Sequence, residues 1–183
     1  MHIIENRVSG FRQAHYKAEM DTPPELPRLR IFLDADACPV KDETYRVAAR
    51  YKIKVYVVAN SPIMVPRVPG IERVVVGAGP DVADDWIVER AARGAIVVTS
   101  DVPLASRCVK NGAEVLAPTG KPFSENSIGM AVATRNLMDE LRSSGQTTGG
   151  PPPFGPRDRS RFLGALDNVV TRLMRAGIKA EAP

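Results

Sequence analysis

The sequence is poor in the residues that mark disulfide-rich, zinc-binding or histidine-dependent proteins. It has two cysteines, Cys38 and Cys108, and two histidines, His2 and His15, in 183 residues. Two cysteines give neither a disulfide framework nor the spacing of a zinc site, so we expect both thiols to be reduced. Both histidines lie near the start of the chain, which argues against a histidine base. Aromatic residues make up only 5%, so the core must consist mainly of Val, Ile, Leu and Ala.

Long hydrophobic runs are also absent. No apolar stretch approaches the roughly 20 residues of a membrane span, and charged residues occupy the N-terminus where a signal peptide needs an apolar segment. We therefore expect a cytoplasmic protein with no membrane partner. The glycine-rich phosphate loops GxxxxGKS/T and GxGxxG do not occur, so nucleotide binding through those loops is not supported. The net charge of +4 is too small to establish nucleic-acid binding.

The length and composition predict one globular domain with an extension in front of it. Hydrophobic residues make up 44% and charged residues 25%, which is typical of soluble globular proteins. Residues 1–27 lack a clear period and end in a proline-rich stretch, which indicates an N-terminal extension or linker. Both Met1 and Met20 are candidate translation starts. Residues 28–175 form the predicted domain, and residues 176–183 form a C-terminal tail.

Strand and helix patterns alternate through the domain. The expected strands are continuous β-branched runs, as in parallel sheets covered by helices on both faces. The sequence therefore predicts a three-layer α/β/α sandwich with a mainly parallel sheet of about five strands. We expect strands at 29–33, 54–59, 71–76, 95–99 and 114–117, helices between them at 40–51, 81–93 and 102–110, and two further helices at 124–143 and 158–174.

Carboxylates gather where the expected strands end and helices begin, which is where ligand chemistry collects in parallel sheets. They are Asp34 and Asp36 after the first strand, Asp84, Asp85 and Glu89 in the helix after the third, and Asp101 after the fourth. Taken singly, each has a structural alternative. An aspartate before a helix is an ordinary N-cap, and carboxylates along a helix can form a solvated face.

The combination of these carboxylates predicts a metal site. Crowded carboxylates repel one another unless a cation neutralises them. Oxygen ligands without histidine or cysteine favour Mg²⁺ or Mn²⁺ over zinc, and such a site can activate water and stabilise charge on a phosphate. The candidate ligands are Asp34, Asp36, Asp84, Asp85 and Asp101, and all of these except Asp84 are also candidate catalytic residues.

Three segments resemble the bacterial YaiI/YqxD family, which is grouped with PIN-like domains. They are DADACPV at 34–40, ADDWIV at 83–88 and TSDVPLA at 99–105, and the resemblance covers about residues 28–175. It implies a PIN-like fold. A looser similarity to PIN ribonucleases implies metal-dependent hydrolysis of phosphodiester bonds in RNA, with single-stranded RNA as a candidate partner and the strand preference left open. By position, Asp34, Asp84 or Asp85, and Asp101 would be metal ligands, and Thr99 or Ser100 would orient one of them.

One departure from the PIN pattern leaves the catalytic function open. PIN enzymes usually carry a glutamate in the helical region after the second strand, whereas residues 62–70 contain no acid. Asp36 is a candidate substitute. Without a substitute, the alternative is a non-catalytic PIN-like module that binds RNA or protein.

A different class of enzyme is also open. Asp34-x-Asp36 after an apolar strand resembles the first motif of haloacid-dehalogenase-type phosphatases, in which one aspartate is the nucleophile and the second a general acid. Those enzymes need a lysine before their later acidic pair, whereas here Lys110 and Lys121 follow Asp84-Asp85.

The candidate substrate contacts, which are alternatively parts of a solvated face, are Asn126, Arg135, Arg157 and Arg159. Nothing in the sequence indicates an oligomeric state.

Overall fold

A mainly parallel β-sheet forms the centre of the protein in the computed structural model, which describes residues 27–36, 38–145 and 153–182. In these residues the strand order is β3-β2-β1-β4-β5-β6, with β7 beside β1. Every neighbouring pair is parallel except β5 and β6. The strands are β1 (Arg28–Asp34), β2 (Lys54–Ala59), β3 (Ile71–Val75), β4 (Ala95–Val98), β5 (Glu114–Leu116), β6 (Pro122–Phe123) and β7 (Lys179–Ala180).

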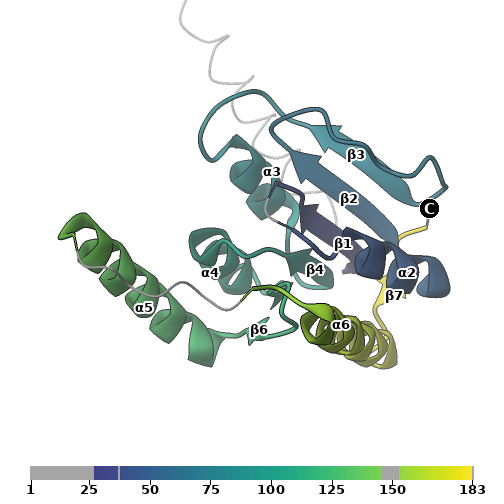
Figure 1. Ribbon diagram of the computed structural model, residues 1–183. Coiled ribbons are helices and arrows are strands. Elements are labelled where there is room, and N and C mark those ends of the chain that lie inside the picture. Colours follow the sequence, from purple (N-terminus) through teal and green to yellow (C-terminus); the bar gives the residue numbers. More distant parts are fainter. Residues whose placement is uncertain (1–26, 37, 146–152, 183) are drawn as a thin grey trace, which may run out of the picture.

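Helices cover both faces of the sheet (Figure 1). On one face, α2 (Lys41–Tyr51) and α6 (Pro156–Arg175) pack against alternate residues of β1 such as Ile31 and Leu33. On the other face, α3 (Val82–Arg90) and α4 (Val102–Lys110) pack around Phe32. Since both faces are covered, β4 is buried at all four positions. The predicted three-layer α/β/α architecture is confirmed.

The remaining helix, α5 (Glu125–Ser143), begins at a capping box and extends away from the sheet beyond α4 (Figure 1). The hydroxyl of Ser124 accepts the backbone N–H of Ser127, and the Ser127 hydroxyl accepts the N–H of Ser124. Most of the helix is exposed, and Ile128 is its one buried residue. No helix in the described part of the chain combines the length and apolar character needed to cross a membrane.

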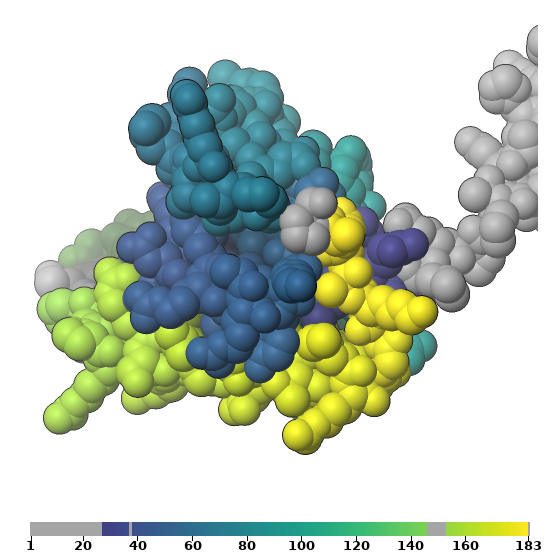
Figure 2. Space-filling model, turned by 90° about the vertical axis from the view of Figure 1, so that its right-hand side faces the viewer, coloured from purple at the N-terminus to yellow at the C-terminus, as the bar shows by residue number. Residues whose placement is uncertain are grey.

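The C-terminal residues join the sheet, whereas the sequence places them in a tail after the domain. β7 pairs with the start of β1, and Glu181 continues the contact, because its N–H bonds the carbonyl of Leu29 and its carbonyl accepts the N–H of Lys54. Figure 2 shows these yellow residues lying against the purple residues of β1. The side chain of Glu181 also pairs with Arg30 and accepts the hydroxyl of Tyr56.

The other differences from the expected elements are small. The helix expected at 81–93 ends at Arg90, because Ala91 has an extended backbone with φ −83° and ψ 101°. The short strands β6 and β7 were not expected. The predicted N-terminal extension, apart from Pro27, lies outside the described residues, and so does most of the glycine- and proline-rich segment between α5 and α6.

Candidate active site

The carboxyl ends of β1 and β4 bring Asp34 and Thr99 together. Leu33 pairs with Val98 in the sheet, so the next residues of the two strands lie side by side. The Thr99 hydroxyl donates a hydrogen bond of 2.7 Å to Oδ2 of Asp34. Asp34 is only 8% exposed and Thr99 is fully buried. The chain has therefore placed a carboxylate in a desolvated position with a fixed orientation.

Asp101 lies two residues beyond Thr99 and is held by two hydrogen bonds. Its backbone N–H donates to the Thr99 hydroxyl oxygen at 2.9 Å, and its Oδ1 accepts the N–H of Leu104 at 2.7 Å. Asp101 is thus the N-cap of α4, as its structural alternative predicts. The cap uses one carboxylate oxygen, and the negative charge of Asp101 still acts on its neighbours.

Asp84 is the third carboxylate of this group and comes from the first turn of α3. Burial, followed by the charges of Asp101 and Asp34, raises the pKa of Asp84 to about 6. Burial also raises the pKa of Asp34. The hydrogen bond from Thr99 opposes that rise, and the charges of Asp36 and Asp101 add to it. Three segments far apart in the sequence therefore share one region of negative potential.

Cations of the chain do not neutralise this group. Among the described residues, Asp34, Asp84 and Asp101 form no ion pair with lysine or arginine. Arg107 is close enough to lower the pKa of Asp84 slightly, but its ion pair is with Asp85, at 2.6 Å. We call Asp34, Asp84 and Asp101 the carboxylate site.

The other predicted acids lie outside the carboxylate site. Asp36 is exposed at its rim, where Oδ2 accepts the backbone N–H of Asn60 at 3.2 Å. Asp85 is exposed and paired with Arg107. Glu89 lies at the far end of α3 and pairs with Arg90 at 3.0 Å. Of the two positions that the sequence left open, Asp84 is therefore the one whose charge interacts with Asp34 and Asp101.

The donors of the carboxylate site are those that Mg²⁺ and Mn²⁺ prefer. In the described part of the chain, however, no three carboxylate, histidine or cysteine side chains lie close enough together to hold a metal ion unaided. Mg²⁺ does not need such a cage, because it is usually bound by one or two carboxylates together with water and substrate phosphates. A buried carboxylate without a cationic partner fits that mode of binding.

The candidate substrate contacts are spread over two helices. Asn126 and Arg157 are exposed in the first turns of α5 and α6, and Arg135 pairs with Asp139 along α5 at 3.7 Å. Arg159 has partners in the protein, since it donates to the carbonyl of Pro39 at 2.7 Å and pairs with Glu43 at 3.2 Å. Ser100 is exposed, and of these two neighbours it is Thr99 that bonds Asp34.

Three residues that contact predicted site residues were not singled out from the sequence. Glu43 is buried in α2 and bound by Arg159, Asn60 holds Asp36, and Arg107 pairs with Asp85. Glu43 could have been found, because it follows Val40 by three positions and precedes Val47 by four on the apolar stripe of its helix. The partners of Asn60 and Arg107 depend on tertiary contacts that no local pattern encodes.

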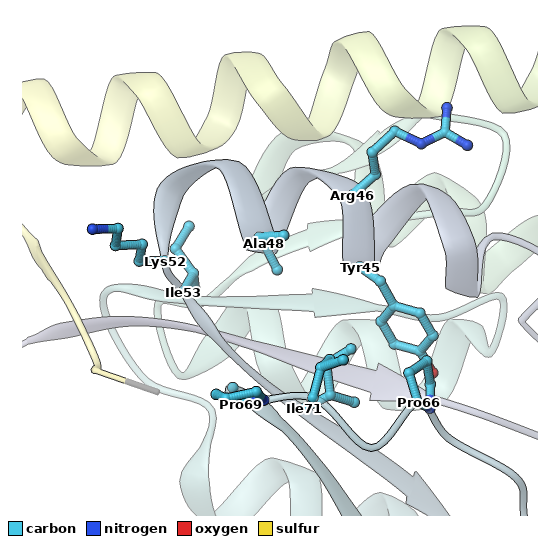
Figure 3. A pocket seen from close by; sticks show the side chains of 11 residues that line it. Tyr45, Arg46, Ala48, Lys52, Ile53, Pro66, Pro69 and Ile71 are labelled. Carbon is cyan, nitrogen blue, oxygen red and sulfur yellow. The ribbon is translucent and has the colours of Figure 1, made fainter.

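A separate cavity of about 490 Å³ lies between α2 and the segment that precedes β3 (Figure 3). Its lining is mainly apolar, with Ala48, Ile53, Pro66 and Ile71, and the ring of Tyr45 packs beside Pro66. The hydroxyl of Tyr45 is buried and has no hydrogen-bond partner among the described residues. None of the predicted site residues lines this cavity.

Comparisons with known proteins identify the family. Residues 32–172 match the family described as "Uncharacterized BCR, YaiI/YqxD family". A UPF0178 protein of Rhodopseudomonas palustris (strain BisB18) is 67% identical over 147 residues, which cover 80% of this chain and 95% of the relative. A UPF0178 protein of Bradyrhizobium diazoefficiens is 62% identical over 162 residues, which cover 88% and 94%. No solved structure matches the chain significantly. The chain belongs to the YaiI/YqxD family, as its three segments imply.

Proposed function

We propose that the protein is a metal-dependent nuclease of the PIN-like type that hydrolyses phosphodiester bonds in single-stranded RNA. The observation that carries this proposal is the carboxylate site. Asp34 is buried at the carboxyl end of β1, Asp84 and Asp101 share its negative potential, and no lysine or arginine of the described chain pairs with any of them. Bound Mg²⁺ or Mn²⁺ would neutralise this charge and could activate water at a phosphate.

The topology supports the proposal. Asp34 is the last residue of β1, and Asp101 follows the adjacent strand β4. Asp84 lies at the start of α3, which covers the face of the sheet from which Asp34 projects. Those are the positions at which the resemblance to PIN ribonucleases places metal ligands. In parallel sheets this edge is also where ligands bind.

Each residue has a distinct part in the proposed site. Asp34 would supply a carboxylate oxygen to the cation, and the charges of Asp84 and Asp101 add to the negative potential that attracts it. Thr99 is a positioning residue, because its one hydroxyl orients Asp34 and holds the backbone of Asp101. Asp36 is exposed beside them and is a further carboxylate that could accept a proton from water.

The test is cleavage of a labelled single-stranded RNA by the full chain in Mn²⁺, Mg²⁺ or EDTA. We expect cleavage with either metal, none in EDTA, and at least a hundredfold loss in Asp34→Asn, the size of effect typical of a removed catalytic group. Asp139→Asn is the matched control, because Asp139 is an exposed aspartate on α5 whose ion pairs within the described residues are with arginines of its own helix. It should retain wild-type activity.

The alternatives give different results in the same assay. Binding of RNA without cleavage under any metal would favour the non-catalytic module. Hydrolysis of 4-nitrophenyl phosphate that is lost in Asp34→Asn, with RNA left intact, would favour the phosphatase. Inactivity of the wild type toward RNA and DNA with every divalent metal would overturn the nuclease proposal.

A further inference from the structure

We propose that a basic, aromatic pocket on the α3 face of the sheet, separate from the carboxylate site, binds a nucleobase that carries a phosphate. The pocket has a volume of about 520 Å³, which lies within the roughly 300–1,000 Å³ typical of small-molecule sites. We call it the aromatic pocket. Its walls include Arg28, Arg30, Phe32, Tyr56, Trp86 and Arg93.

Two partly exposed rings of the aromatic pocket, Tyr56 and Trp86, provide a surface suited to a planar ligand, and the third ring, Phe32, is buried. Phe32 and Tyr56 stack with centroids 5.3 Å apart, and Trp86 lies edge-on to Phe32 at 5.9 Å. Nucleobases stack on such rings regardless of base identity. Arg90 already lies over one side of the Trp86 ring, at 4.2 Å, so guanidinium stacking is part of the pocket.

The charge of the aromatic pocket favours an anion. Arg30 pairs with Glu181 at 3.2 Å and Arg90 with Glu89 at 3.0 Å. Arg28 and Arg93 also line the pocket and form no ion pair with the described residues. An adjoining cavity shares these two arginines and adds Lys179. Unpaired guanidinium groups next to stacking rings are suited to the phosphate of a nucleotide.

An unused donor supports the same conclusion. Nε of Arg30 is buried and has no hydrogen-bond partner among the described residues. Buried donors normally have an acceptor, and one without a partner requires an explanation. A polar group on a bound base or phosphate would provide an acceptor at this wall of the pocket.

The aromatic pocket and the carboxylate site are distinct. Arg30, Phe32 and Asp34 alternate along β1 and therefore project from the same face. Along the strand, Arg30 lies four positions, about 13 Å, before Asp34, and Phe32, the pocket residue of β1 nearest to Asp34, lies two positions, about 7 Å, before it. The pocket contains none of the proposed metal ligands. Binding there consequently requires no metal and no hydrolysis, so this inference goes beyond the proposed function.

Trp86 makes the binding directly measurable, because it is the one tryptophan of the chain. Its fluorescence would be followed in the full chain in EDTA while adenosine monophosphate, or unpaired pentaadenylate RNA, is added. We expect saturable quenching by a stacked base. Arg28→Gln and Arg93→Gln should each weaken binding about tenfold, as expected for the loss of a charge-assisted hydrogen bond.

Controls separate this binding from other effects. Arg50→Gln removes an exposed arginine on α2, which covers the other face of the sheet, and should bind as the wild type does. Asp34→Asn should also bind normally, so failure of the nuclease proposal would leave this result intact. Tighter binding of adenosine monophosphate would identify the ligand as a free nucleotide, and tighter binding of pentaadenylate would identify it as RNA; both support the proposal.

Three results would overturn it. One is the absence of saturable quenching with both ligands. Another is affinity that is unchanged in both Arg28→Gln and Arg93→Gln. The third is competition by inorganic phosphate as strong as that by adenosine monophosphate, because the pocket would then recognise only an anion.

Discussion

The hydroxyl of Thr99 donates a hydrogen bond to Asp34, a residue 65 positions earlier in the chain. The oxygen of the same hydroxyl accepts the N–H of Asp101. One side chain therefore joins the ends of β1 and β4 and positions two of the three carboxylates. Since Thr99 is fully buried, no water can take over both hydrogen bonds without repacking.

Replacing Thr99 by valine should destabilise the protein by about 1–3 kcal/mol, because two buried polar groups lose their partner. Thr99→Ser retains the hydroxyl and should recover most of that stability. Urea denaturation at neutral pH measures both values. Equal stability of the valine variant and the wild type would show that the hydrogen bond makes no net contribution.

The two roles of Asp101 can be separated by two substitutions. Asp101→Ala removes both the cap and the charge, and the lost cap should cost about 1 kcal/mol. Asp101→Asn can keep the bond to the N–H of Leu104 while it removes the charge that acts on Asp84 and Asp34. In EDTA, we therefore expect the melting temperature of the asparagine variant to equal or exceed that of the wild type.

The same melts in Mn²⁺ test the cation. A ligand that binds only the folded state adds about 2.7 kcal/mol at a hundredfold excess over Kd. This corresponds to a rise of roughly 5–10 °C for a domain of this size. Asp34→Asn and Asp101→Asn should show a smaller rise. If neither Mn²⁺ nor Mg²⁺ changes the melting temperature of the wild type or the variants, the carboxylate site does not bind a cation.

The raised pKa of Asp84 predicts a pH dependence in the metal-free protein. The folded state binds the proton of Asp84 more tightly than the unfolded chain does. The stabilisation that this proton gives the folded state is therefore complete below about pH 4 and is lost as the pH rises through about 6. Asp84→Asn lacks this titration. Unfolding free energies in EDTA should be similar for both proteins at pH 4, and the variant should be the more stable at pH 7. If the difference in unfolding free energy between the variant and the wild type were the same at pH 4 and pH 7, the raised pKa of Asp84 would be wrong.

Two tyrosines of α2 should respond differently to loss of the hydroxyl. Burial, with the charges of Asp42 and Cys38, raises the pKa of Tyr45 to about 12, and its hydroxyl has no partner among the described residues. Tyr45→Phe should leave the melting temperature unchanged or raise it. The hydroxyl of Tyr51 donates to Asp167 at 3.1 Å, so Tyr51→Phe should lose about 1 kcal/mol. Destabilisation by Tyr45→Phe would indicate a partner for its hydroxyl.

Strong local patterns made most of the fold predictable. The buried run before Asp34 and the helix at 102–110, which starts after Asp101 and ends at Asn111-Gly112, both have their expected positions. β7 was not predictable, because Lys179 and Ala180 carry no strand pattern and pair only through contact with β1. For the same reason, the role of Glu181 depends on tertiary structure.

The sequence indicated which residue types form the candidate site but not which of the candidate residues lie together in it. Strand ends indicated Asp34 and Asp101, since parallel strands place their carboxyl ends at one edge. The choice between Asp84 and Asp85 depends on the direction in which each projects from α3, and the structure pairs Asp85 with Arg107 while the charges of Asp34 and Asp101 act on Asp84. Sequence alone could not show that Arg159 contacts Glu43, because those residues belong to helices far apart in the chain.

The alternation of Arg30, Phe32 and Asp34 along β1 makes the register of this central strand a shared condition for both proposed sites. A slip of one residue would turn all three side chains toward α2 and α6 and bring Ile31 and Leu33 to the α3 face. The guanidinium and the carboxylate would then lie in the apolar layer together. An insertion or deletion within β1 should therefore abolish both sites at once, whereas point substitutions in either site can leave the other intact.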